Sequence, residues 1–187
     1  MPVQIGVKTH SFSEPTGLLS DCHRRIETFL GSLQQVAPLL DRPLNAEART
    51  ALEASLHYFR EAAPKHTADE EESLFPRLRR VNHPEVKAAI ETLDPLEKEH
   101  KQADALHDVV DQLGRKCLTG ASLSAEEAQQ FRQSVGKLAS IYEEHIRIED
   151  EIVFPVAGKL LAASDKAAIA EEMAQRRSSL GRRHIQK

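Results

Sequence analysis

Apolar residues recur at steps of three and four along most of the chain, while the strict alternation typical of β-strands is nearly absent. A first helix is predicted over residues 15–40, where Leu19 and Ile26 share one face with later leucines. A second helix is predicted over residues 46–80, after a short polar break. Pro64 should kink or split this second helix, because proline lacks the N–H group and clashes with the preceding turn.

The middle of the chain predicts a short helix followed by a third long one. The short helix covers residues 85–93. Pro95 suits the first position of the long helix, where an N–H group would be unsatisfied in any case, and Asp94 precedes it as a candidate N-cap. This third helix should end near Gly120, because glycine commonly terminates helices.

The last third of the chain predicts another long helix and a short one. Ser124 and Glu127 form a capping-box pattern that opens a helix continuing to about Leu161. Ser164 and Asp165 can cap a final short helix that ends near Arg177. Four long helices joined by short breaks favour an all-α, up-down-up-down four-helix bundle. This bundle would carry an extra short helix between its halves and a short C-terminal helix.

The length of 187 residues suits one domain with short tails. We expect the domain to span residues 14–177, with a flexible N-terminus over residues 1–13 and a basic tail over residues 178–187. The net charge of −4 argues against nucleic acid as the main partner. No apolar run is long enough for a membrane span. Residues 1–10 lack a signal core, and the two cysteines form no disulfide framework, so a cytoplasmic location is expected.

Two stretches of eleven residues, 79 positions apart, nearly superimpose. Residues 66–76 read HTADEEESLFP, and residues 145–155 read HIRIEDEIVFP. A further histidine precedes each copy, because His23 lies 43 residues before the first and His100 lies 45 residues before the second. The chain therefore reads as His…His-x3-Glu written twice.

This doubled pattern places metal-ligand side chains at helical spacing. The second histidine of each half lies four residues before a glutamate, so both side chains share one face of a helix. A buried glutamate without a compensating charge would be very costly, so two of them at matched depth indicate bound metal. Four inward-facing helices could bring together six candidate metal ligands, which are His23, His66, Glu70, His100, His145 and Glu149.

The number of donor atoms predicts two metal ions. Four imidazole nitrogens and four carboxylate oxygens are too many for one tetrahedral zinc ion. They fit two ions that share both carboxylates as bridges. A bridging oxide or hydroxide would fill further positions and leave about one open position on each six-coordinate ion. Oxygen species or a substrate could bind there.

The same residues resemble the hallmark of the haemerythrin-like (HHE cation-binding) family, whose fold is a four-helix bundle. The phrases CHRRIE at residues 22–27, EEESLFP at residues 70–76 and EMAQRR at residues 172–177 are similar to that family as well. The resemblance covers residues 18–177. It implies a non-haem di-iron centre with Glu70 and Glu149 as bridging carboxylates. It also implies oxygen, nitric oxide or peroxide chemistry, or iron sensing.

The chain departs from the oxygen-carrying members of the family at one position. Those members have a fifth histidine, often four residues after the third, where this chain has Asp104. The equivalent residue in the first half is Glu27. These two carboxylates would either bind metal and fill the open positions, or orient the histidines and leave the site open. His107 shares a face with His100 and is another possible ligand.

Three functions are compatible with the pattern. The first is a di-iron protein that binds or senses oxygen, nitric oxide or peroxide, or reports iron itself. The alternative is a di-iron enzyme that detoxifies peroxide or nitric oxide or catalyses another oxidation, with Glu71, Tyr142 or His107 as proton donor. The third is a metal-stabilised interaction domain. Iron suits the imidazole and carboxylate donors, but manganese or zinc could also occupy them.

Overall fold

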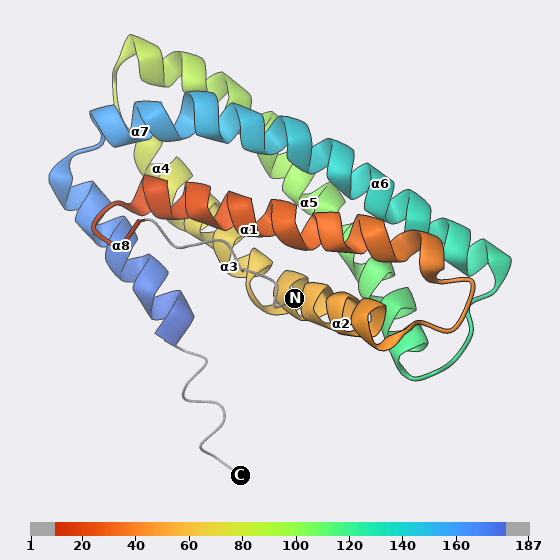
Figure 1. Ribbon diagram of the computed structural model, residues 1–187. Helices are drawn as coiled ribbons and strands as arrows, with labels where there is room; N and C mark the ends of the chain where they lie inside the picture. Colours follow the sequence, from red (N-terminus) through yellow and green to blue (C-terminus); the bar gives the residue numbers. More distant parts are fainter. Residues whose placement is uncertain (1–9, 179–187) are drawn as a thin grey trace.

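The computed structural model describes residues 10–178, the side chain of Asp94 excepted, and shows an all-helical bundle (Figure 1). The fold predicted from the sequence is therefore confirmed. In chain order the elements are α1 (Pro15–Val36), the 3-10 turn η1 (Ala37–Leu39), α2 (Ala46–Glu61), α3 (Ala63–Ala68), the π-helical segment η2 (Asp69–Leu74), α4 (Phe75–Leu78), α5 (Pro84–Leu118), α6 (Ala125–Ile148), the π-helical segment η3 (Glu149–Val153), α7 (Phe154–Leu160) and α8 (Ala163–Ser178).

Four helical columns make up the bundle. The first column is α1 and the third is α5. The second column runs from α2 through α3 and η2 to α4, and the fourth runs from α6 through η3 to α7. Neighbouring columns pack in a ring, because α1 contacts α2, α2 contacts α5, α5 contacts α6, and α6 contacts α1. This is the up-down arrangement expected when short breaks join long helices (Figure 1).

The two predicted tails fall largely outside the described residues. Of the N-terminal stretch 1–13, the structure describes residues 10–13, and of the basic stretch 178–187 it describes Ser178, which ends α8. The backbone N–H of His10 donates a hydrogen bond to Asp21 in α1 at 2.8 Å. Among the helices of the described part, none is long and apolar enough to cross a membrane.

Local sequence signals set several helix ends. The second helical column is interrupted between Glu61, which ends α2, and Ala63, which begins α3. This interruption lies beside Pro64, as predicted. At the start of α6, the Ser124 hydroxyl accepts a hydrogen bond from the Glu127 N–H, and the Glu127 carboxylate accepts one from the Ser124 N–H. This capping box satisfies backbone donors that have no partner inside the helix.

The third column differs from the prediction. The sequence indicated a short helix over residues 85–93 and a new helix at Pro95, whereas α5 is continuous across that position. Pro95 is exposed, so the backbone carbonyl that loses its usual N–H partner can be hydrated. Leu93 and Leu96 are fully buried on either side. Their burial in one apolar cluster holds both halves of the helix in line, and this outweighs the proline's preference for a helix start.

Each copy of the repeat contains a π-helical segment, which the sequence pattern did not predict. A backbone hydrogen bond that spans five residues closes each segment. The Phe75 N–H donates to the Glu70 carbonyl, and the Phe154 N–H donates to the Glu149 carbonyl. A proline follows each phenylalanine and has no N–H group to donate. The π-helical turn therefore ends at a position where the regular backbone hydrogen bonds of the helix are interrupted by the proline. Such segments occur frequently at functional sites.

Two separate apolar clusters fill the interior of the bundle. In α1, Leu19 belongs to one cluster and Ile26 to the other, with His23 between them. In α5, Leu96 belongs to the same cluster as Leu19 and Ala103 to the same cluster as Ile26, with His100 between them. The histidines therefore form a polar layer between two water-excluding cores.

A buried ion-pair network attaches α8 to the second column. Asp69 is fully buried, and its carboxylate oxygens lie 2.9 Å from Arg176 Nη1 and 2.6 Å from Arg177 Nη2. Arg77 binds Glu172 through two hydrogen bonds of 3.0 Å and 2.7 Å. Because Asp69 is the residue before Glu70, these contacts hold the start of the π-helical segment η2 in place.

Replacing Asp69 by alanine should lower the free energy of unfolding by about 3 kcal/mol, because two arginines would lose the carboxylate that compensates them in a partly buried place. Urea unfolding of the metal-free protein measures this loss. The control is Glu72→Ala, which removes a mostly exposed carboxylate that pairs with the same Arg176 and should cost less than about 1 kcal/mol. Similar losses for both variants would contradict the network's role.

Candidate metal centre

The structure brings the six candidate ligands together in the layer between the two apolar clusters. Each helical column supplies one histidine, and the two π-helical segments supply the two glutamates. None of the six side chains is more than 7% exposed. They are His23 from α1, His66 from α3, Glu70 from η2, His100 from α5, His145 from α6 and Glu149 from η3.

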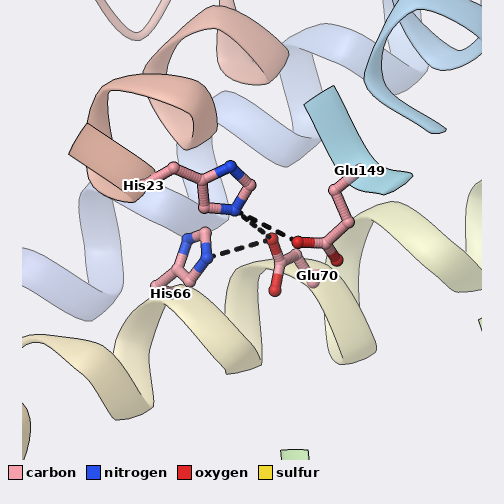
Figure 2. Close-up of side chains that lie close together, drawn as sticks. All are labelled: His23, His66, Glu70 and Glu149. Atoms are coloured by element: carbon pink, nitrogen blue, oxygen red, sulfur yellow. Dashed lines mark ion pairs between the residues drawn. The ribbon is translucent and has the colours of Figure 1, made fainter. Parts of the chain in front are cut away.

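Figure 2 shows one group of four of these residues around a common centre. Nε2 of His66 lies 3.2 Å from Glu70 Oε1. Nε2 of His23 lies 3.1 Å from Glu149 Oε2 and 3.8 Å from Glu70 Oε1. One donor atom from each residue lies within 4.8 Å of the others. Two imidazoles and two carboxylates therefore surround a space that a single metal ion could occupy.

A second group of four uses the same two glutamates with the other two histidines. Nε2 of His100 lies 3.5 Å from Glu70 Oε2, and Nε2 of His145 lies 3.2 Å from Glu149 Oε2. Each carboxylate has two oxygens, so it can offer one to each of two ions. The buried histidines and glutamates are consistent with a dinuclear metal site, with a pair of histidines at each end.

The carboxylates lack the partners that a metal-free core would need. Glu70 and Glu149 are fully buried, and none of their four oxygens accepts a hydrogen bond of good geometry from the described residues. The ring nitrogens that lie 3.1–3.8 Å away do not meet hydrogen-bond geometry, so burying these carboxylates is costly, and bound metal cations would remove that cost. The donor set and its unsatisfied oxygens therefore fit a pair of metal ions.

Charges within the cluster shift the protonation of its members. Burial and the charge of Glu149 raise the pKa of Glu70 to about 8. Burial opposes the ionisation of Glu149, but the adjacent imidazoles of His145 and His23 outweigh burial and lower its pKa below the usual range. Burial also opposes the protonation of His145, yet Glu149 and Glu70 raise its pKa to about 9. The metal-free cluster thus holds protons that metal cations would displace.

Three of the four histidines are anchored through the ring nitrogen that faces away from the cluster. An Nδ1–H that donates to a carboxylate orients the ring and leaves Nε2 as the metal donor. The three pairs are His23 with Asp150 at 3.0 Å, His100 with Glu71 at 2.8 Å and His145 with Glu99 at 2.9 Å.

Sequence reasoning missed most of these anchors. The sequence pattern indicates Glu71 only as a candidate proton donor, and it indicates no role for Asp150 or Glu99. The repeat did carry a signal for two of them, because Glu71 and Asp150 occupy matched positions directly after the two glutamate ligands. Glu99 has no such signal, since it depends on how α5 and α6 pack together.

His66 is the exception among the four histidines. Its Nδ1 atom is buried and has no hydrogen-bond partner among the described residues. Burial and the positive charge of His23 lower the pKa of His66 well below its ordinary value. The His66 ring is held by packing instead, edge-on to the His23 ring with centroids 4.8 Å apart. The two ends of the cluster therefore differ, because the end formed by His100 and His145 has a carboxylate on both rings.

The structure does not place the three additional candidates in the cluster. Glu27 is exposed and pairs with Arg24 at 2.9 Å. Asp104 is exposed and lines a separate cavity. His107 also lines that cavity, and its Nε2 lies 2.9 Å from the hydroxyl of Tyr142. Metal binding by these three residues therefore finds no support in the described geometry.

A small cavity faces the cluster. Its volume is about 10 Å³, and it is lined by all four histidines together with Tyr142, Thr67 and apolar side chains. A cavity of this size holds about one water-sized molecule. The metal-facing cavity therefore leaves room for a small ligand on the histidine side of the site.

Replacing Asp150 by asparagine should weaken metal binding about 10- to 100-fold, because the amide orients the His23 ring less strongly than the carboxylate does. Competition with a chelator of known affinity measures the change. The neighbouring Glu151→Gln is the matched control, since Glu151 is exposed and pairs with Arg147. Equal weakening in both variants would show that Asp150 has no special role.

Together, the fold and the cluster define a class of protein: a four-column helical bundle with a buried histidine and glutamate site of dinuclear type. The domain described as Hemerythrin HHE cation binding domain matches residues 14–157. The chain belongs to this family, and the matched region contains all six clustered residues. It is also similar to a Haemophilus influenzae protein described as an uncharacterized protein, with 28% identity over 169 residues, which is 89% of this chain and 92% of the relative.

Proposed function

We propose that this protein holds two iron ions at the cluster and uses them to bind or sense dioxygen, nitric oxide or peroxide. The same site could instead report the availability of iron itself. The observation that carries this proposal is that two groups of four buried residues share both Glu70 and Glu149. A site built for one ion would not need the second pair of histidines.

The donor chemistry supports iron. Imidazole suits zinc, copper, iron and nickel, and carboxylate suits harder ions, so a mixed set favours an ion that accepts both. Four imidazoles and two shared carboxylates leave six-coordinate ions with positions for exogenous ligands. Manganese and zinc are the other occupants that this donor set would accept, and the metal must be identified by measurement.

Each part of the site has a separate role in this proposal. His23 and His66 would hold one ion, and His100 and His145 would hold the other. An iron pair supplies redox-active positions for oxygen species. Phe154 stacks against the His23 ring at 5.2 Å and keeps water away from that side, while the metal-facing cavity, which holds about one water-sized molecule, marks the side from which a small ligand would approach.

The test is metal content together with an optical spectrum, on protein produced in iron-replete medium. We expect roughly two iron ions per chain and ferric absorption bands that bleach on anaerobic reduction and return in air. Iron that never responds to air would restrict the function to iron sensing or structure. The absence of stoichiometric metal after loading with iron, manganese or zinc would overturn the proposal.

One observation favours the enzymatic alternative. Tyr142 lines the metal-facing cavity, and its hydroxyl is hydrogen-bonded to His107, so a hydroxyl group lies beside the place where peroxide would bind. Burial raises the pKa of Tyr142, so the hydroxyl stays protonated and would act as a hydrogen-bond donor to bound peroxide rather than as a strong acid. Peroxide turnover by the iron-loaded protein that falls at least about tenfold in Tyr142→Phe, with metal content unchanged, would identify an enzyme.

A further inference from the structure

A second, larger cavity lies beside the metal-facing one, between the α2–α3 column and α5. Its volume is about 330 Å³, which is within the range of small-molecule sites. Ala63, Thr67 and Tyr142 line both cavities. A molecule in the larger cavity, here called the side cavity, would therefore be separated from the cluster by one layer of side chains.

The inner wall of the side cavity is apolar and aromatic. Leu56, Phe59 and Val110 line it, and each of the three is buried. The Phe59 ring stacks on the His107 ring with centroids 4.4 Å apart. Stacked rings in a wall provide a flat surface for a ligand with an aromatic or aliphatic body.

Two buried polar atoms in the residues that line the side cavity lack partners. Oδ1 of Asp111 is buried and accepts no hydrogen bond, and Arg60 Nη2 lies 3.7 Å from it. Nδ1 of His107 is also buried without a partner, although Nε2 of the same ring is bonded to Tyr142. Both atoms are covered by neighbouring groups, so they give this wall a polar character without facing the open cavity.

The charge around the side cavity favours a cation. Three aspartates line it against a single arginine, Arg60. Asp111 is compensated by Arg60 and by Arg115 at 3.1 Å. Asp104 and Asp108 have no cationic partner within 4.0 Å in the described part of the chain. The entrance therefore carries uncompensated negative charge, which repels anions and attracts cations.

We propose that the side cavity binds a small organic cation, namely a primary amine with an aromatic or short aliphatic body. The ammonium group would pair with Asp104 and Asp108, whose charges no arginine or lysine compensates in the described part of the chain, and the apolar body would pack against Phe59 and Val110. The ligand needs no metal ion for these contacts, so this proposal goes beyond the proposed function and does not depend on it.

The first test is isothermal titration of the full-length protein, metal-loaded and metal-free, with three probes of matched shape: benzylamine, benzyl alcohol and benzoate. We expect saturable binding of benzylamine by both forms, at least about tenfold tighter than benzyl alcohol, and no measurable binding of benzoate. Equal binding of all three probes, or no saturable binding of benzylamine, would overturn the proposal. Binding by the metal-loaded form alone would assign the amine to the metal ions instead.

Two variants locate the binding. Val110→Phe places a larger side chain in the cavity and should abolish benzylamine binding. Asp108→Asn alters only an exposed carboxylate, so the chain should fold normally and bind benzylamine about three- to tenfold more weakly. Asp41→Asn removes an exposed carboxylate far from the cavity in sequence and should leave binding unchanged. Undiminished binding in both cavity variants would exclude the side cavity as the site.

Discussion

Replacing Glu70 by glutamine should remove metal from both positions of the cluster rather than from one. Glu70 belongs to both groups of four ligand residues, and its two oxygens face different histidines. A neutral amide offers a single weak oxygen donor and cannot bridge two cations as a carboxylate does. We therefore expect bound iron to fall from roughly two ions per chain to nearly none, as measured by elemental analysis after loading and desalting.

His66→Gln is the matched control, because His66 belongs to one group only. Its loss should leave roughly one ion per chain, bound at the end formed by His100 and His145. If Glu70→Gln also retained one ion, the carboxylate would not bridge. If His66→Gln lost both ions, loss of one ion would empty the other position as well. The difference in metal content between the two variants would then not support bridging by Glu70.

The same Glu70 variant should not be less stable than the natural chain when metal is absent. The pKa of Glu70 is about 8 in the folded state, against an ordinary value of 4.5. As pH rises from 4.5, the unfolded chain releases this proton while the folded chain retains it, so the folded state loses stability progressively up to pH 8. Glutamine carries no such proton, and the metal-free variant should gain about 1–3 kcal/mol at neutral pH. Urea unfolding thus separates loss of metal from loss of fold.

Metal affinity should rise about 1000-fold for each pH unit between pH 6 and pH 8. In this range the metal-free cluster holds a proton on Glu70, whose pKa is about 8, and another on His145, whose pKa is about 9. It holds a third on His23, because burial, which opposes protonation, is outweighed by Asp150 and Glu149, which raise the pKa of that imidazole well above its ordinary value. These protons must leave before the three groups bind metal, and three displaced protons give a slope of about three decades per pH unit. The gain ends above the raised pKa values, because no proton remains to be displaced.

Chelator competition at several pH values measures this slope once the chelator's own protonation is included. Titration calorimetry in two buffers of different ionisation enthalpy counts the released protons independently. His145→Gln should reduce the slope by about one decade, because one of the three protons is then absent. A flat profile from pH 6 to pH 8 would show that none of the three groups is protonated in the metal-free protein.

Much of this protein follows from local sequence rules. The three- and four-residue spacing of apolar side chains predicts the helices, and Pro64 and the pair Ser124 and Glu127 mark helix boundaries that the structure confirms. The two His-x3-Glu copies at an offset of 79 residues, with one further histidine before each copy, predict which histidines and glutamates lie together. These features are readable because helix periodicity and capping depend on residues only a few positions apart.

The continuity of α5 and the π-helical segments could not be read in the same way. Pro95 is a good helix start by local preference, but the burial of Leu93 and Leu96 in the packed bundle keeps the helix unbroken. The prolines after Phe75 and Phe154 were visible in the sequence, yet a wider turn is only one of several ways to accommodate a missing N–H group.

Contacts between distant segments belong to the tertiary structure alone. Asp150 reaches His23 across 127 positions of sequence, and Glu99 reaches His145 across 46. Such pairs depend on the relative rotation and height of packed helices, which no local pattern specifies. The sequence by itself thus determined the bundle, the repeat and the six candidate ligands. Only the packing of the columns determined which carboxylate orients each ring and where cavities remain beside the cluster, because both depend on side chains meeting across helices.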